Sequence, residues 1–156
     1  VYINEVYHDN SSKTGIENAG WDPEVDFIEL YNSTNSQVDI SGWEIYDDTD
    51  DDSKKYVVPA GTVIPAKGYL VYDVFKTNPN GPQFGLGVGG DWVYIYKPGK
   101  GELVDVMEIP GFSKESGLRD KGYTFGRLTD GSTNLTIFKE ASKGASNNGK
   151  EVISQE

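Results

Sequence analysis

Short runs of strand-forming residues, separated by turn residues, recur along the whole chain and constrain its fold more than any other feature. No window holds apolar residues at i, i+3, i+4 and i+7 over a length that predicts a helix. The 19 Gly, 10 Tyr and 6 Phe are typical of strands joined by tight turns. The pattern predicts an all-β fold, either a sandwich or a barrel.

The individual runs predict where the strands and turns lie. Residues 25–32 carry apolar groups on both faces, which predicts a central strand, and residues 38–47 are interrupted at Ser41-Gly42, which predicts a bend or bulge. Residues 92–97 and 102–109 flank a Pro-Gly-Lys-Gly turn and predict a hairpin. Residues 123–128 and 135–139 flank a second such turn.

The length of 156 residues predicts one domain. Residues 141–156 are small and polar, which predicts a linker or a frayed tail, and we place the domain at 1–147 with a C-terminal tail or linker at 148–156. The chain starts at Val1, inside a strand-like run, so we interpret it as a processed form or an excised domain.

Charge and composition exclude several classes of function. The 25 Asp and Glu outnumber the 14 Lys and Arg, and the net charge of −11 would repel the phosphates of a nucleic acid. The chain has no Cys, so it forms no disulfide and no thiolate metal site. No apolar run approaches the roughly 18 residues of a spanning helix, so we expect no transmembrane segment.

Two motifs point to ligands on first inspection. Residues 85–90 match G-x-G-x-x-G, but a strand-like run follows them where a dinucleotide site needs a helix, so we interpret them as a glycine-rich loop. Asp48, Asp50 and Asp52 have the spacing of a calcium loop. Ser53 and Pro59 stand where an EF-hand needs Gly and Glu, which leaves a looser Ca²⁺ site or a solvated acidic loop.

Single residues offer further candidates. His8, the one imidazole, is a general base, a metal ligand or a surface residue. Trp21, in the loop 9–24, either stacks on a sugar or partner or folds back over one end of the core, whereas Trp43 and Trp92 are expected in the core. N-x-S/T triplets at Asn10, Asn32 and Asn134 matter only in a source that glycosylates.

An ordered set of segments resembles the lamin tail domain family in its prokaryotic form. The segments include Ile3–Val6, Asp26–Asn32, Val38–Trp43, Val58–Pro65, Gly68–Val71, Gly126-Arg127 and Gly144–Asn147, so the resemblance runs from about Ile3 to Asn147. The resemblance implies an immunoglobulin-like antiparallel β-sandwich. The chain has no heptad rod and no basic segment, so filament assembly and chromatin binding do not transfer to it.

The resemblance also implies an extracellular or cell-surface location, because prokaryotic members look like accessory modules of secreted or surface proteins. We therefore expect a non-catalytic binding module, with a protein or cell-surface glycan as partner and no cofactor other than Ca²⁺. The alternatives are a metal-assisted hydrolase using His8 with Asp or Glu, and a structural spacer. Glu29, placed mid-strand, either pairs with Arg127 in a bridge between two strands, or both side chains reach solvent.

Overall fold

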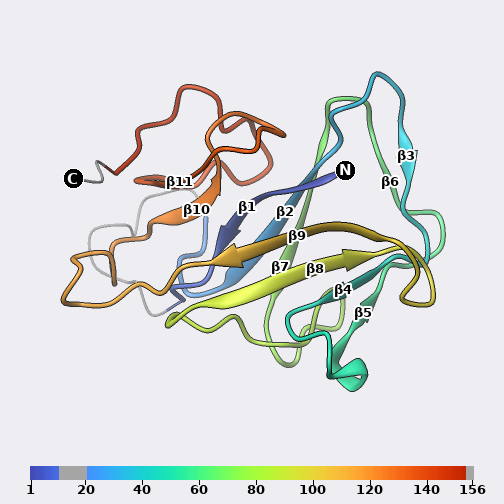
Figure 1. Ribbon diagram of the computed structural model, residues 1–156, viewed down its shortest axis with the longest axis horizontal. Coiled ribbons are helices and arrows are strands. Elements are labelled where there is room, and N and C mark those ends of the chain that lie inside the picture. Colours follow the sequence, from blue (N-terminus) through green and yellow to red (C-terminus); the bar gives the residue numbers. More distant parts are fainter. Residues whose placement is uncertain (11–20, 154–156) are drawn as a thin grey trace.

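The computed structural model describes residues 1–10 and 21–153 of the chain. These residues form eleven antiparallel strands and one short 3₁₀ helix, η1, so the predicted all-β fold is confirmed (Figure 1). The strands are β1 (Tyr2–Tyr7), β2 (Asp26–Tyr31), β3 (Val38–Asp39), β4 (Glu44–Tyr46), β5 (Tyr56–Val57), β6 (Val63–Ile64), β7 (Tyr69–Val74), β8 (Asp91–Tyr96), β9 (Leu103–Ile109), β10 (Thr124–Arg127) and β11 (Leu135–Phe138), and η1 spans Asp52–Lys54.

The strands build two main sheets that pack over a common core. The described strands of the first sheet run in the order β11-β10-β1-β2-β7 and those of the second in the order β5-β4-β8-β9, while β3 and β6 form a separate pair. Apolar side chains from both sheets, such as Ile28 of β2 and Ile95 of β8, belong to one buried cluster. The arrangement is the predicted antiparallel β-sandwich.

The predicted central strand and bend both occur. All six residues of β2 are buried, because β2 lies between β1 and β7 and is covered on both faces. Gly42 adopts φ +77°, a conformation that favours glycine, and it turns the chain from β3 into β4. The predicted hairpin is β8 with β9, whose register shifts between Ile95 and Tyr96.

One glycine allows β10 to lie against β1. A Cβ atom at Gly126 would lie 2.2 Å from the carbonyl oxygen of Asn4, and backbone atoms of that strand cannot move aside. Glycine is therefore required at this position of β10.

The prediction that residues 141–156 form a frayed tail is wrong for the described part, 141–153. Val152 forms a β-bridge with Phe138, and the Ile153 amide donates to the carbonyl oxygen of Ile137 at 2.9 Å. This segment packs back on the first sheet because its polar groups complete a network described below. The predicted boundary after Asn147 stays a prediction.

The two tryptophans that were expected in the core, Trp43 and Trp92, differ in their exposure to solvent. Trp43 is partly buried against the core, but Trp92 is 40% exposed, so its prediction is wrong. Val93 and Ile95 are the residues of β8 that point into the core, and Trp92 lies on the opposite face because side chains alternate along a strand. None of the described residues forms a helix long and apolar enough to span a membrane.

Candidate functional site

The outer face of β8 presents a row of three aromatic side chains, which we call the aromatic strip: Trp92, Tyr94 and Tyr96. The Trp92 and Tyr94 rings lie 5.9 Å apart with planes inclined by 15°, and the Tyr94 and Tyr96 rings lie 6.4 Å apart at 17°. Tyr46 of β4 packs edge-on to Tyr96 at 5.5 Å, but it is buried and adds no exposed surface to the row. The strip forms because every second residue of β8 is aromatic and the intervening ones are aliphatic.

The neighbouring strand β9 completes this surface. Glu108 is directly opposite Trp92 in the β8–β9 register, and Val106 is opposite Tyr94. Both β9 residues are exposed, Val106 at 36%. An aromatic, apolar and acidic surface therefore lies on the β8–β9 hairpin, and a contiguous apolar patch of this kind is a candidate binding surface.

A groove of about 780 Å³ adjoins the Trp92 end of the strip. Figure 1 shows the end of β9 beside β10 and β11, and the groove lies between these strands. Its lining includes Asp91, Trp92, Glu108, Ile109, Phe125, Leu135 and Ile137. No lysine or arginine is among the described residues that line it.

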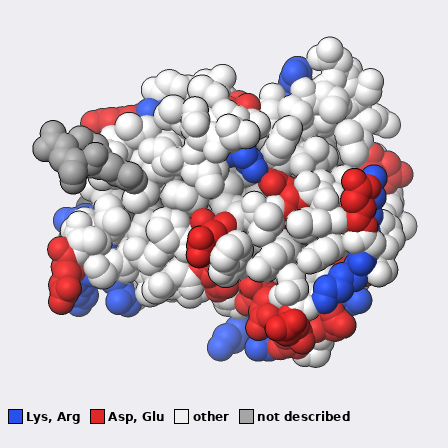
Figure 2. Space-filling model, viewed as in Figure 1, with Lys and Arg blue, Asp and Glu red and all other residues white. Residues whose placement is uncertain are grey.

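Carboxylates lie near the Trp92 and Tyr94 part of the strip. Burial raises the pKa of Tyr94, and Tyr96 together with Asp48, Asp50 and Glu108 raises it further. Figure 2, drawn from the direction of Figure 1, shows acidic side chains gathered where β4, β5 and η1 lie, with lysines beside them. The carboxylates near Tyr94 favour a cationic group over an anionic one at that part of the strip.

The three aspartates expected to form a calcium site lie in the loop after β4. Asp48 accepts a hydrogen bond from the Asp50 amide, and Asp52 accepts one from the Tyr46 hydroxyl at 3.1 Å. The Lys100 ammonium lies 3.4 Å from Asp52. In residues 1–10 and 21–153 no three His, Asp or Glu side chains group in a way that could hold a metal ion. The calcium site stays a prediction.

His8 is buried, so the expectation of a surface residue is wrong. Its Nε2 lies 2.8 Å from the Pro110 carbonyl oxygen, and its ring packs edge-on to Phe112 at 4.5 Å. Its Nδ1 is buried with no hydrogen-bond partner, and burial lowers the pKa of His8. Because Pro110 lines the groove, His8 supports the groove wall from inside.

Trp21 packs against the end of the first sheet. Its ring is edge-on to Tyr7 at 4.7 Å and to Phe27 at 5.9 Å, and it is half-buried. These contacts agree with a residue that folds back over the core. Residues 11–20 of its loop lie outside the described residues, and a role for Trp21 in ligand contact stays a prediction.

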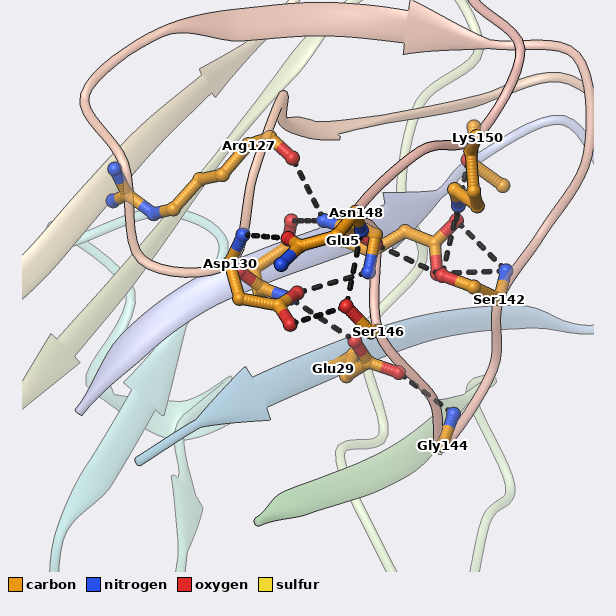
Figure 3. A network of polar contacts seen from close by, with 12 residues as sticks. Glu5, Glu29, Arg127, Asp130, Ser142, Gly144, Ser146, Asn148 and Lys150 are labelled. Atoms are coloured by element: carbon orange, nitrogen blue, oxygen red, sulfur yellow. Dashed lines mark hydrogen bonds and ion pairs between the residues drawn. The ribbon is translucent and has the colours of Figure 1, made fainter. Parts of the chain in front are cut away.

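A buried polar network joins the C-terminal segment to the first sheet (Figure 3). Glu5 and Glu29 face each other across β1 and β2 and are both fully buried. Glu5 accepts from Lys150 at 2.7 Å and from Thr124 at 2.6 Å, while Glu29 accepts from the Gly144 amide at 2.7 Å. Burial and the nearby Glu5 charge raise the pKa of Glu29 to about 8.

The predicted pair of Glu29 with Arg127 is wrong. Arg127 instead pairs with Asp105 at 2.8 Å and donates to the Ile3 carbonyl oxygen. The two residues cannot meet as expected, because β1 lies between β2 and β10 in the sheet.

Of the N-x-S/T sites, Asn32 is fully buried and its amide donates to three carbonyl oxygens, so it is no glycan acceptor.

The aromatic strip is the feature that interpretation of the sequence missed. Its signal was present, since Trp92, Tyr94 and Tyr96 alternate with Val93 and Ile95. Both sets are apolar, however, so the pattern could not show which set faces the core.

The chain is therefore an antiparallel β-sandwich domain with an exposed aromatic face and a buried polar network. A comparison with known protein families identifies the family of this domain. The Lamin Tail Domain family model matches residues 1–111, and the chain belongs to this family of immunoglobulin-like β-sandwich domains. No curated protein matches the chain.

Proposed function

We propose that the chain is a non-catalytic recognition module of a bacterial secreted or cell-surface protein, accessory to neighbouring domains. The observation that supports this proposal is the aromatic strip: three aromatic rings in one row on the outer face of β8, with Trp92 40% exposed beside a groove. Tyrosine and tryptophan supply much of the binding energy of recognition surfaces.

The support beneath the strip suits binding better than catalysis. β8 is paired on both sides, by β4 and β9, so its outward side chains are held in a fixed geometry before a ligand arrives. The described His and carboxylate side chains form no group that could hold a metal ion, and His8 is used to support Pro110. A protein or a cell-surface glycan can each present an apolar face to such a row of rings.

Substitution of one exposed aromatic residue tests the proposal. Trp92→Ala is compared with Phe75→Ala, a control at a matched exposure of 39% in the chain after β7. The labelled domain is applied to a glycan array, and the immobilised domain is used to select binders from a displayed random-peptide library. We expect Trp92→Ala to weaken binding of the selected ligands by about tenfold or more, and Phe75→Ala to leave it unchanged. Equal effects of the two substitutions would overturn the strip as the binding surface.

A further inference from the structure

We infer that the aromatic strip and its groove bind an extended, arginine- or lysine-containing segment of a partner protein. This inference rests on the proposed function and names the chemistry of the ligand. It is based on three observations: the shape of the groove, the charge around it, and the way this fold places cations elsewhere.

The groove has the shape of a site for an extended chain. It lies beside β9, at the edge of the described second sheet, and β11, at the edge of the described first sheet. Leu135 is 42% exposed and Trp92 40% exposed on its two sides. An extended segment that lies along such a groove can place alternate side chains on the apolar lining and toward the rim.

The charge around the groove selects the sign of the ligand. Glu108 and Asp91 line it, and no basic side chain is among its described lining residues. The strip continues toward Asp48 and Asp50, which lie close enough to Tyr94 to affect its charge state. The whole chain carries a net charge of −11. A cationic segment is therefore attracted, and an anionic glycan or a nucleic acid is repelled.

The fold itself shows how a cation binds between a ring and a carboxylate. The Arg127 guanidinium lies 4.9 Å from the Tyr2 ring centre and pairs with Asp105 at 2.8 Å. The Lys100 ammonium lies 5.0 Å from the Tyr46 ring centre and 3.4 Å from Asp52. In both places the cation contacts an aromatic face and an acid together, which suits arginine above all.

Trp92 and Glu108 repeat the aromatic and acidic parts of this arrangement. They are directly opposite in the β8–β9 register, and both are exposed. Within residues 1–10 and 21–153, no lysine or arginine lies over the Trp92 ring or pairs with Glu108. A side chain of the partner would supply the cation, stacking on Trp92 while it pairs with Glu108.

Synthetic peptides of matched length test the inference. The probe alternates arginine and valine, and its analogues replace every arginine by glutamine or by glutamate. Binding to the whole domain is measured by fluorescence anisotropy at low and at physiological salt, next to a neutral β-glucan oligosaccharide. We expect the arginine peptide to bind about tenfold or more tightly than the glutamine analogue, with weaker binding at higher salt. Equal binding of the two peptides, or no binding of the arginine peptide at low salt, would overturn the inference.

Variants locate the site. We expect Glu108→Gln and Trp92→Ala each to lower the affinity of the domain for the arginine peptide by about fivefold or more. Glu102→Gln removes an exposed acid from the turn of the same hairpin and should leave the affinity unchanged. If Glu102→Gln lowered the affinity for the peptide as much as Glu108→Gln, the peptide would be attracted by the overall negative charge and not by one site, and the inference would fail.

The test separates this inference from the function on which it rests. Binding of the neutral glycan alone, lost in Trp92→Ala, would overturn the cationic-segment inference and support the recognition module. Peptide binding that neither Trp92→Ala nor Glu108→Gln changes would overturn both.

Discussion

Arg127 and Asp105 form an ion pair that joins the two sheets of the sandwich. Arg127 lies on β10 and Asp105 on β9, with Nη2 and Oδ2 2.8 Å apart and the two side chains 8% and 15% exposed. The same carboxylate oxygen accepts a hydrogen bond from the Ile3 amide of β1 at 2.7 Å. One largely buried carboxylate therefore connects β9 to both β1 and β10.

Arg127→Met is expected to lower the free energy of unfolding by about 3 kcal/mol, because it leaves Asp105 without its cation in a largely buried position. Chemical denaturation measures the change. The double variant Arg127→Met with Asp105→Leu should lose less than the sum of the two single variants, since neither charge is then left alone. Strict additivity, or an unchanged stability of Arg127→Met, would show that the pair is not a structural link.

Lys150 and Lys139 provide a matched comparison near the C-terminus. Lys150 pairs with the fully buried Glu5, whereas Lys139 pairs with Glu151 where both side chains are exposed. We expect Lys150→Met to cost about 3 kcal/mol, because Glu5 would lose its cation. Lys139→Met should leave stability unchanged, since exposed ion pairs contribute little. Equal effects in thermal and chemical denaturation would contradict the buried network.

The raised pKa of Glu29 predicts a pH dependence of defined sign. Burial and Glu5 raise this pKa from 4.5 to about 8, so the folded state binds a proton that the unfolded state has released. The contribution of Glu29 to stability is therefore full below about pH 4.5 and is lost as the pH rises to about 8. The slope is at most about 1.4 kcal/mol per pH unit.

Glu29→Gln removes this titration. The difference between the unfolding free energies of wild type and variant should fall with pH over that window and be flat outside it. A difference for Glu29→Gln that rises with pH would show that Glu29 is ionised in the folded state.

The acidic loop after β4 offers a test with calcium. The loop already contains neutralising contacts, with Lys54 near Asp51 and Lys100 near Asp52, so we expect a chelator to leave the melting temperature unchanged. Added CaCl₂ tests the predicted calcium site directly. A bound ion would give heat in calorimetry and raise the melting temperature, and Asp50→Ala would abolish both effects. No heat with the wild type would remove the calcium prediction.

Local patterns in the sequence predicted most of the strands. The central strand β2, the bend at Gly42 and the β8–β9 hairpin follow from alternation, apolar density and turn residues, which act within a few positions. The segments that resemble the lamin tail domain family also predicted the family and the sandwich. These features are local or depend on the order of local pieces along the chain.

The charge partners of side chains and their exposure could not be predicted from such local patterns. Glu29 was expected beside Arg127, but β1 separates their strands, and Glu29 meets Gly144 of the C-terminal segment instead. That segment is polar and small, as a linker would be, and it is held by contacts to Glu5 and Glu29 and by a β-bridge from Val152 to Phe138. A residue's charge partner depends on sheet order, which the strand pattern leaves open.

The sequence by itself determined the all-β class, the positions of the main strands and turns, and membership of the family. Only the tertiary structure decided that Trp92 faces outward, that His8 is buried behind the groove, and that residues 141–153 pack against the first sheet. The physical reason is the range of the interactions. Strand and turn preferences depend on near neighbours in sequence, whereas burial and charge pairing depend on segments brought together from distant parts of the chain.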